Sequence, residues 1–481
     1  MASVVVVGGG VGGLAAAVRL QAGGHGVTVL ERHGVVGGKL GVRRRDGFSF
    51  DTGPSLVTLP AVIDELFRVA GSSLAEEMDL VRLDPQFRYR WPDGTTWDVA
   101  DPVMGRSESV PPGGNPDAVD EFLRIGGQMW DVSERTFFAG PMTGLGSLLR
   151  RMRSPRDLTT IRPLQTLQAF ATEQLADSHL VQWAGRYATY SGSSPWRAPA
   201  TLCCIAAIEA RYGCWYPRGG LAVIGESLAR LAADLGVEVR VDSEVARITT
   251  ASSGAVSGVE LADGSRLAAE IVVANVDAEH LYSTLQPDAR ALRRVRRAPR
   301  STSGLAILVG VRGTTEHLAH HNIWFSSDSR REFGQLAAGE PADEPTVYAC
   351  VSSVTDASQA PAGDENWFVL VNAPPDPDRV PAAYAEVVLD RLAACGVDLR
   401  PRAAFTEVIT PADLEHRFRN PGGAIYGTSS DGRRAAFLRP ANRGARRGLY
   451  LVGGSSHPGG GLPLVMISAR IVADMIGADG W

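Results

Sequence analysis

The chain has 481 residues, more than a single hydrophobic core usually holds, so two or three domains are expected. A hydrophobic content of 44% and a charged content of 21% are typical of globular proteins and exclude a largely disordered chain. The net charge of −5 argues against a nucleic-acid partner, because binding to a phosphate backbone requires a strong excess of basic residues.

The first forty residues carry the most informative pattern. Residues 4–7 are four valines, a run short enough for a buried parallel strand, and they are followed by the glycine-rich segment 8–13. The Ala-rich segment 14–20 predicts a helix, and the apolar run 27–30 predicts a second strand that ends at Glu31. The order strand, glycine turn, helix, strand and acid is that of a mononucleotide-binding βαβ unit.

Each glycine of this unit has a mechanical role in such a site. Gly8 allows a tight turn, Gly10 lets the backbone approach a pyrophosphate, and Gly13 lets the helix pack closely on the strand. The helix N-terminus then directs free N–H groups and its positive dipole end at the phosphates. Glu31 is placed to accept hydrogen bonds from a ribose 2′-hydroxyl, which disfavours NADP and leaves NAD and FAD open.

The rest of the chain alternates helical and β-rich regions. Residues 91–116 are rich in Pro and Gly and predict a loop, with a domain junction at residues 111–114. Residues 117–210 are expected to be mainly helical, and residues 299–411 alternate apolar strands with polar turns. A helix over residues 221–235 leads to a small sheet of short strands, expected at residues 237–241, 256–261 and 271–274. A last buried strand is expected at residues 449–452, so the nucleotide-binding domain should be discontinuous.

The cysteines and the N-terminus indicate a cytoplasmic protein. The five cysteines have no metal-ligand spacing and are odd in number, so we expect reduced thiols and no metal site. The chain begins directly in its first strand, without the basic and apolar regions of a secretory signal. No stretch approaches about eighteen consecutive apolar residues, so any membrane contact would be peripheral, on the inner face of the cell membrane.

Several motifs resemble those of flavoproteins. The glycine segment with Glu31 resembles the FAD-binding start of glutathione-reductase-like and amine-oxidase-like flavoproteins, and Gly37, Gly38 and Lys39 resemble their second glycine signal. Residues 50–55, Phe-Asp-Thr-Gly-Pro-Ser, resemble the following segment of bacterial carotenoid desaturases. Residues 216–220, Tyr-Pro-Arg-Gly-Gly, with Glu244 and Val245 later, resemble the returning part of the FAD domain. The cofactor that this resemblance implies is FAD.

The most specific motif is C-terminal. Residues 448–463, Gly-Leu-Tyr-Leu-Val-Gly-Gly-Ser-Ser-His-Pro-Gly-Gly-Gly-Leu-Pro, resemble the signature of the phytoene dehydrogenase family, and residues 320–322 and 420–427 add to the similarity. The resemblance covers essentially the whole chain. Ser456 stands where Thr is usual, and Gly460 stands where Ala or Val is common. The His-Pro-Gly-Gly-Gly form resembles late-pathway desaturases, including those acting on hydroxylated carotenoids.

The resemblance implies an α/β fold with a discontinuous Rossmann-like FAD-binding domain and a substrate domain of mixed β-sheet and helices. The FAD-binding domain is expected to comprise residues 1–105, 213–285 and 430–481. The substrate-binding domain is expected to comprise residues 106–212 and 286–429, with a helical part that faces a membrane.

The same resemblance gives the candidate cofactor residues, each with a physical role. Gly453 and Gly454 would let the backbone lie against the ribityl-pyrophosphate chain, and Pro463 suits the first turn of a helix that runs to about residue 476. The positive end of that helix would stabilise the anionic reduced flavin. Arg32 and Lys39 would supply positive charge near the pyrophosphate, and Val245 would touch the adenine through its backbone. The complete expected set is Gly8, Gly10, Gly13, Glu31, Arg32, Gly37, Gly38, Lys39, Val245, Gly453, Gly454 and Pro463.

His457 is the candidate catalytic residue. Desaturation removes a hydride from one carbon and a proton from its neighbour, and the flavin carries the difficult step. His457 is expected near the flavin as a proton acceptor; its alternative role is to hydrogen-bond the turn. Asp51 is expected to be structural or on the ribityl side, and the adjacent His320 and His321 are expected to pack or turn the chain.

The function implied is an FAD-dependent desaturase of a lipophilic isoprenoid or carotenoid. Two alternatives remain open: a flavin oxidase of another substrate such as an amine, and a non-catalytic isoprenoid-binding protein similar to Rab GDP-dissociation inhibitors. Residues 148–153 and 291–297 mix apolar residues with arginine, as segments that rest on anionic lipid do. Solvated helix faces are the alternative interpretation of both segments.

Overall fold

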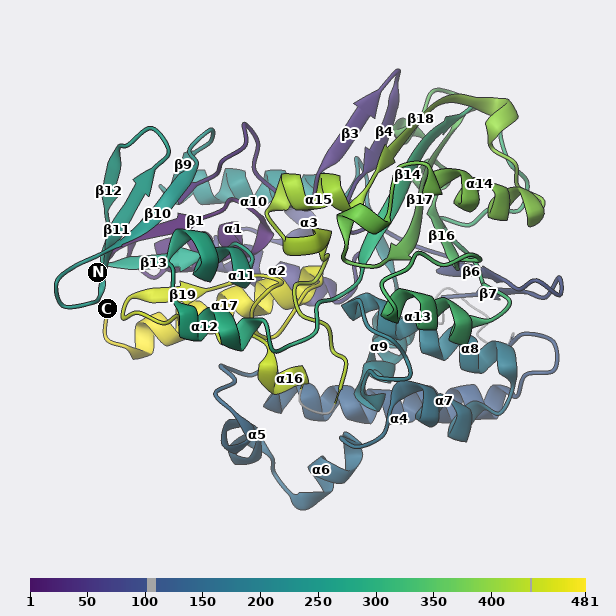
Figure 1. Cartoon of the computed structure of the whole chain (residues 1–481), viewed down its shortest axis with the longest axis horizontal. Coiled ribbons are helices and arrows are strands. Elements are labelled where there is room, and N and C mark those ends of the chain that lie inside the picture. Colours follow the sequence, from purple (N-terminus) through teal and green to yellow (C-terminus); the bar gives the residue numbers. More distant parts are fainter. Residues whose placement is uncertain (102–109, 433–434) are drawn as a thin grey trace.

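A parallel sheet assembled from three distant parts of the chain forms the nucleotide-binding side of the protein (Figure 1). The structure is a computed structural model that describes residues 1–101, 110–432 and 435–481. Within these residues the sheet has five parallel strands in the order β19-β13-β1-β2-β9. They are β1 (Ser3–Val7), β2 (Gly26–Leu30), β9 (Glu238–Arg240), β13 (Ile271–Ala274) and β19 (Leu449–Leu451). The predicted α/β fold with a βαβ start is confirmed.

Different layers cover the two faces of this sheet, and the valines of β1 contribute to the hydrophobic cores on both faces. Successive strand residues point to opposite faces. Val4 and Val6 therefore join the core beneath the helices, whereas Val5 and Val7 join a core on the other face. The helices are α1 (Val11–Ala22), α2 (Pro60–Val69), α10 (Ala222–Asp234) and α17 (Leu462–Ala478), and the other layer consists of β10 (Val245–Thr250), β11 (Val256–Leu261) and β12 (Arg266–Ala268).

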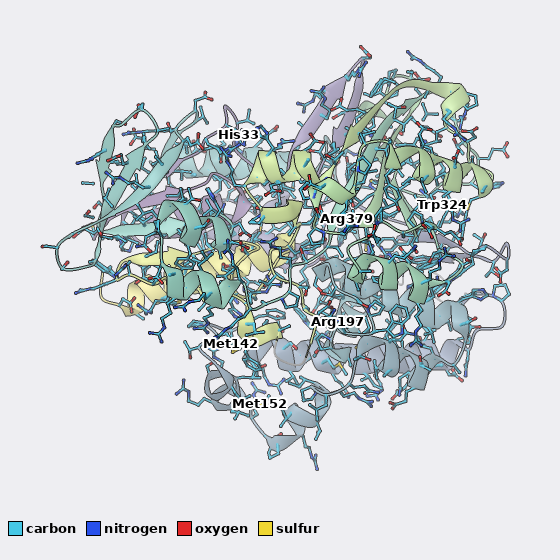
Figure 2. All side chains as sticks on the ribbon, viewed as in Figure 1. His33, Met142, Met152, Arg197, Trp324 and Arg379 are labelled. Atoms are coloured by element: carbon cyan, nitrogen blue, oxygen red, sulfur yellow. The ribbon has the colours of Figure 1, made fainter. Side chains whose placement is uncertain are left out.

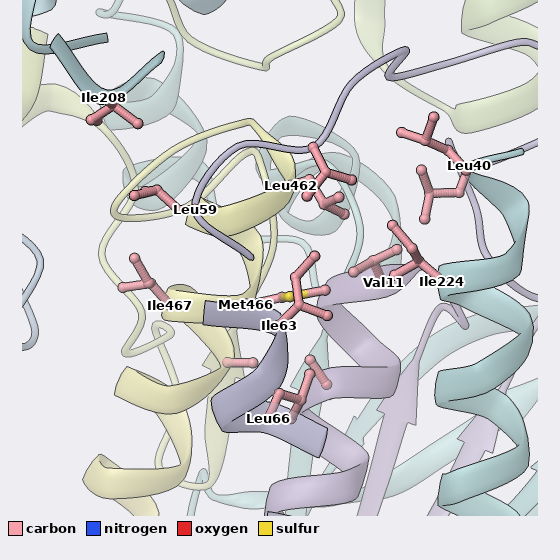
Figure 3. Close-up of a cluster of buried hydrophobic side chains, with 14 of the residues drawn as sticks. Val11, Leu40, Leu59, Ile63, Leu66, Ile208, Ile224, Leu462, Met466 and Ile467 are labelled. Carbon is pink, nitrogen blue, oxygen red and sulfur yellow. The ribbon is translucent and has the colours of Figure 1, made fainter. Parts of the chain in front are cut away.

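The helical face has a continuous apolar core. Figure 3 shows Ile63 and Leu66 of α2, Met466 of α17 and Ile224 of α10 directed toward one another around the start of α1. Helices α1 and α17 are in extensive contact, so the C-terminal helix is packed against the helix that follows the first glycine turn. The two ends of the chain are thereby brought to one place.

The expected small sheet is correct for residues 256–261 and wrong for residues 237–241, where β9 pairs with β2 in the parallel sheet, and for residues 271–274. The latter form β13, which pairs with β1 and β19 in the parallel sheet. All four residues of β13 are buried, as expected of a strand covered on both faces.

A mixed sheet forms the second lobe, at the right in Figure 1. Among the described strands its order is β18-β14-β17-β16-β15-β6-β7, and its pairs are antiparallel except β15 with β6. The strands are β6 (Phe87–Arg90), β7 (Thr96–Val99), β14 (Ser303–Val311), β15 (His321–Trp324), β16 (Val347–Cys350), β17 (Glu365–Ala373) and β18 (Ala403–Ile409). Helix α14 (Tyr384–Ala394) covers one face, and Trp324, labelled in Figure 2, belongs to the core on that face.

Strands β6 and β7 correct the expected division of the chain. Residues 1–105 were assigned to the nucleotide-binding domain, but β6 pairs with β15 of the mixed sheet and β7 pairs with β6. The expected loop over residues 91–116 is also wrong where β7 lies. Phe87 and Tyr89 are buried and alternate with Arg88 and Arg90, the pattern of a half-buried strand. The expected boundary between residues 105 and 106 lies outside the described residues.

Helices form the lower lobe in Figure 1, as residues 117–210 predicted. Asn115 caps the longest of them by accepting a hydrogen bond from the backbone N–H of Asp117. The lobe contains α4 (Pro116–Thr136), α5 (Leu145–Arg151), α6 (Pro155–Thr160), α7 (Leu167–Leu175), α8 (Ser178–Arg186) and α9 (Cys204–Tyr212). Across the described ranges, no helix combines the length and the apolar character needed to cross a bilayer.

Shorter elements connect the lobes. They are α3 (Leu74–Glu77), α11 (Ala278–His280), α12 (Ala289–Val295), α13 (Ser329–Ala337), α15 (Pro411–Phe418), α16 (Ala435–Leu438), β3 (Val42–Arg45), β4 (Phe48–Asp51), β5 (Leu80–Arg82) and β8 (Trp215–Pro217).

Candidate functional site

A cavity of about 560 Å³ is lined by residues of the parallel sheet's glycine turns, of the mixed sheet and of α8. Every expected cofactor-binding residue except Gly13 lines it. The cavity therefore joins the nucleotide-binding side to the second lobe.

The N-terminal glycines have the geometry that the βαβ pattern predicts. Gly8 has a φ of +101°, which permits the tight turn after β1. A Cβ atom on Gly13 would lie 2.1 Å from the carbonyl oxygen of Gly8, so only glycine lets α1 pack this closely. Gly13 thus packs against the turn without lining the cavity. Gly10 is the N-cap of α1 and lines the cavity.

The second glycine signal packs against the first. The N–H of Gly37 donates to the carbonyl oxygen of Gly9 at 2.8 Å. A Cβ atom on Gly38 would lie 2.9 Å from the Cα atom of Gly10, and Gly38 has a φ of +60°. Residues 37 and 38 are therefore part of the same wall as residues 8–10.

The Glu31 carboxylate is held in a fixed orientation at the end of β2. One oxygen accepts a hydrogen bond from the N–H of Gly9 at 2.8 Å, and the other accepts from the N–H of His33 at 2.9 Å. Each carboxylate oxygen retains a further acceptor position, so ribose hydroxyls can still bind from the cavity. Figure 2 shows His33 close to α15, where its ring lies 3.0 Å from the carbonyl oxygen of Arg417.

Asn275 links the N-terminal and C-terminal halves of this wall. Its side-chain N–H donates to the carbonyl oxygen of Gly8 at 3.1 Å. A Cβ atom on Gly453 would lie 2.4 Å from the Asn275 side-chain oxygen, and Gly453 has a φ of +98°. Sequence reasoning missed Asn275, although a polar residue directly after the buried strand β13 was a usable signal.

Comparison with known proteins identifies the family. Residues 11–476 match the model of the family described as flavin containing amine oxidoreductase. The chain belongs to this family. It is 34% identical over 488 residues to a 4,4′-diapolycopene oxygenase of Methylomonas sp., covering 99% of this chain and 98% of that protein. It is 35% identical over 485 residues to a hydroxyneurosporene desaturase of Cereibacter sphaeroides, covering 99% and 97%.

Solved structures of low identity show the same fold. An oxidoreductase from Methanosarcina mazei superposes with a TM-score of 0.64 at 16% identity, over 98% of this chain and 100% of that one. The chain is an FAD-dependent oxidoreductase of the family, as the glycine motifs predicted.

The cationic groups in the cavity wall fit an anionic dinucleotide. Arg32 Nη1 is buried and lacks a hydrogen-bond partner among the described residues; the Glu244 carboxylate lies 3.9 Å away. Lys39 Nζ donates to the carbonyl oxygen of Ile425 at 2.6 Å, and burial lowers the Lys39 pKa to about 8. Both side chains line the cavity, as do the first turns of α1 and α17, whose free N–H groups favour phosphate oxygens.

The buried side chain of Arg439 holds the turn between β19 and α17, which forms part of the cavity wall. Arg439 donates to the carbonyl oxygens of Tyr426, Thr428 and Gly454 at 3.2, 2.6 and 2.9 Å. It thereby fixes the turn between β19 and α17, whose residues 460–463 line the cavity. Pro463 lies in the first turn of α17, which begins at Leu462 as predicted to within one residue.

The position of His457 argues against its expected catalytic role and favours the alternative, a histidine that holds the turn. His457 is not among the residues that line the cavity across the described part of the chain. Its ring is buried against Phe137 at a centroid distance of 4.7 Å, and its Nε2 lies 3.2 Å from the carbonyl oxygen of Gly140. Burial lowers the His457 pKa to about 4. The motif located the turn correctly but could not give the direction of one side chain within it.

Asp51 has the structural role that was one of its two expected roles. Its carboxylate accepts hydrogen bonds from the Tyr216 hydroxyl at 2.9 Å and from the N–H of Leu221 at 2.8 Å. Asp51 therefore ties the segment 50–55 to the segment 216–220.

His320, His321 and Cys350 form a buried cluster whose candidate ligand atoms lie within 4.8 Å of one another. The rings pack as expected: Tyr216 against His320 at 4.5 Å and Phe87 against His321 at 5.0 Å. Burial lowers the pKa of His320 to about 3 and that of His321 in the same direction, so both rings are neutral.

The part of the cavity beyond the glycine wall is apolar and aromatic. It is lined from the mixed sheet by Ala306, Ile323, Phe325, Phe368 and Leu370, and from the connecting segments by Trp196 and Phe333. Tyr348 also lines it, and its hydroxyl is hydrogen-bonded to Ser55 and to His321. This chamber suits an extended hydrocarbon.

Proposed function

We propose that the protein is an FAD-dependent dehydrogenase that desaturates a carotenoid or carotenoid precursor at CH–CH bonds. Its substrate class would be that of a phytoene-desaturase-like enzyme, including a late-pathway desaturase of hydroxylated carotenoids. The observation that carries the proposal is the continuous cavity, which joins a glycine-walled cofactor site to an apolar, aromatic chamber. Relatives named for carotenoid oxidation, matched over 97% or more of their length, support the same conclusion.

The chain's own residues would bind and orient the two reactants. FAD supplies hydride acceptance when bound. The walls of residues 8–10, 37–38 and 453–454 would hold its phosphates and ribityl chain, and Glu31 would hold its adenosine ribose. The aromatic chamber would align the polyene and keep water away from the reacting carbons.

The amine-oxidase alternative is less consistent with the charges in the chamber. Arg186 lines the cavity and is a half-buried cation, which would repel a protonated amine. Glu332 also lines the cavity, but its carboxylate already accepts hydrogen bonds from Ser326 and Thr346, and burial raises its pKa. A neutral polyene meets neither obstacle.

Anaerobic flavin reduction separates the three possible functions. The purified FAD-loaded protein would be mixed with phytoene or a hydroxylated carotenoid in liposomes, or with an aqueous amine such as putrescine. Bleaching of the oxidised-flavin absorbance by a polyene, with a desaturated product on chromatography, is expected. Bleaching by the amine alone would support the amine oxidase. Polyene binding without bleaching would support an isoprenoid-binding protein.

We also propose a peripheral membrane contact through the lower helical lobe, on the cytoplasmic face of the membrane. Four large apolar side chains there are exposed: Leu145 and Leu149 of α5, Leu158 of α6, and Leu164. Arg150, Arg153 and Arg156 beside them are exposed as well, which suits anionic lipid headgroups. A water-insoluble substrate held in lipid would need such a contact.

Of the two basic segments predicted to meet lipid, only residues 148–153 retain an exposed apolar side chain, Leu149. In residues 291–297, the helix α12 buries Val295 and packs Leu292 against the core, and Arg296 pairs with Glu279. That segment is a solvated helix face, which was its alternative interpretation.

A further inference from the structure

Arg186 is a cation in the wall of a chamber that is lined mainly by apolar and aromatic side chains. It lies at the C-terminal end of α8, and its guanidinium stacks on the rings of Phe87 at 4.6 Å and Tyr190 at 5.2 Å. One nitrogen donates to the Tyr89 hydroxyl at 2.9 Å, and another donates to the Tyr190 hydroxyl at 3.2 Å. The aromatic groups therefore fix the guanidinium in one orientation.

The charge of Arg186 has no carboxylate in direct contact among the described residues. The nearest acid in its network is Glu209, which accepts hydrogen bonds from the hydroxyls of Tyr190 at 2.6 Å and Tyr187 at 2.8 Å. Glu209 is thus connected to Arg186 only through a tyrosine. A guanidinium has five N–H donors, and groups in the described part of the chain accept from two of those on Arg186.

Gln182 lies beside Arg186 on the same face of α8. Residues four apart on a helix are neighbours, and both side chains line the cavity. The Gln182 amide nitrogen donates to the carbonyl oxygen of Ser326 at 2.9 Å and to the Ser329 hydroxyl at 2.6 Å. Its side-chain oxygen accepts from no group in the described ranges, so a free acceptor stands next to the free donors of Arg186.

A purely hydrocarbon substrate would leave these groups buried without partners, which is costly. A hydroxyl group both donates and accepts, and so matches the pair. Resting on the proposed function, we propose that Arg186 and Gln182 are specificity-determining residues that bind a hydroxyl group carried by the polyene substrate. Arg186 donates to the hydroxyl oxygen, and Gln182 accepts its proton in a hydrogen bond.

The test compares two polyenes of equal length and equal conjugation, one with a terminal hydroxyl and one without. kcat and KM for anaerobic flavin reduction would be measured with the full-length FAD-loaded protein and its variants. In Arg186→Met, KM for the hydroxylated polyene should rise about 10- to 100-fold relative to the hydrocarbon, as expected for loss of a hydrogen bond to a charged group. Arg186→Lys should restore part of the preference.

Gln182→Leu is a second variant that tests the same pair of residues, with a smaller expected effect. It should raise the hydroxyl-specific KM ratio about tenfold or less, as expected for a neutral hydrogen bond. Arg162→Met is the matched control, because Arg162 stacks on Phe170 at 4.9 Å in the same lobe and does not line the cavity. That variant should leave the ratio unchanged.

Each outcome is decisive. A wild-type protein that oxidises both polyenes with equal KM, or an Arg186→Met variant that slows both equally, overturns the inference and leaves the proposed function intact. If Arg186→Met fails to fold, an unchanged ratio in Gln182→Leu overturns it. A wild-type flavin that no polyene reduces overturns the proposed function itself.

Discussion

Asn275 donates a hydrogen bond to the carbonyl oxygen of Gly8 across 267 positions of sequence, at a distance of 3.1 Å. The same side chain contacts Gly453 through its oxygen, on the C-terminal half of the wall. One amide therefore sets the spacing between the first glycine turn and the last. The cofactor site exists only when β1, β13 and β19 are paired in one sheet.

Gly453→Ala should weaken FAD binding at least tenfold. The new methyl group would lie 2.4 Å from the Asn275 oxygen, at a backbone φ of +98° that L-residues rarely adopt. Asn275 must then move, and its hydrogen bond to Gly8 is lost. Titration of the apoprotein with FAD, followed by flavin fluorescence, gives the dissociation constant.

Gly254→Ala is the control for this variant. Gly254 also has a positive φ, +80°, but a Cβ atom there meets nothing within 4 Å. It therefore carries the backbone strain without the clash. Equal weakening by both variants would show that the contact with Asn275 does not matter.

Lys39 should make FAD affinity depend on pH near 8. Burial lowers its pKa to about 8, so the amine is charged below that pH and becomes neutral above it. If its charge faces the pyrophosphate, the dissociation constant for FAD should rise about tenfold between pH 7 and pH 9. Lys39→Arg should abolish this dependence because arginine stays protonated. An unchanged slope in Lys39→Arg would remove Lys39 from phosphate binding.

Lys39 is also the only lysine of the chain, so chemical labelling can test its position. An amine-reactive reagent should modify Lys39 in the apoprotein and be blocked by saturating FAD. The amine of Met1, which is fully exposed, is the internal standard and should react in both states. Labelling of Lys39 that FAD does not slow would place the cofactor elsewhere.

The sequence was sufficient for the parts of the site that depend on local geometry. Gly8 and Gly13 could be assigned because a βαβ turn has only one way to place helix against strand. The position of Glu31 at the cavity wall followed from its place at the end of the second strand. These relations involve neighbours within about twenty residues and need no knowledge of the rest of the fold.

Relations between distant segments could not be read in the same way. β6 pairs with β15, more than two hundred residues later, and β7 pairs with β6. Nothing local to residues 87–90 specifies β15 as the partner. The direction of the His457 ring depends on Phe137 and Gly140 of the helical lobe. Asn275 and Arg439 act through backbone carbonyls of other segments, and a sequence pattern does not record such contacts.

His457 should lower stability in acid rather than take part in catalysis. Its pKa is lowered to about 4, below the ordinary value of 6.5, so the neutral ring is favoured in the folded state. The unfolded state then binds more protons between pH 6.5 and pH 4, and stability contributed above pH 6.5 is lost as the pH falls through that window. The full loss is about 3 kcal/mol.

Urea unfolding at several pH values checks this expectation. His457→Asn should lose about 3 kcal/mol less than the wild type between pH 7 and pH 4 and should retain polyene-dependent flavin reduction. His317→Asn, at an exposed position, should follow the wild-type curve. A large loss of kcat in His457→Asn, with FAD still bound, would restore the catalytic role.

The exposed leucines of the lower helical lobe should control binding to anionic vesicles. Leu149 is 47% exposed and Leu164 is 71% exposed, and burying a leucine in an apolar phase is worth about 1.5–3 kcal/mol. The double variant Leu149→Glu, Leu164→Glu should therefore weaken flotation with phosphatidylglycerol vesicles at least tenfold at low salt. Val354→Glu alters an equally exposed apolar side chain outside this lobe, at 49% exposure, and should float like the wild type. Because Arg150, Arg153 and Arg156 add an electrostatic component, high salt should also reduce binding of the wild type. Equal flotation of the wild type and the double variant would exclude this surface as the membrane contact.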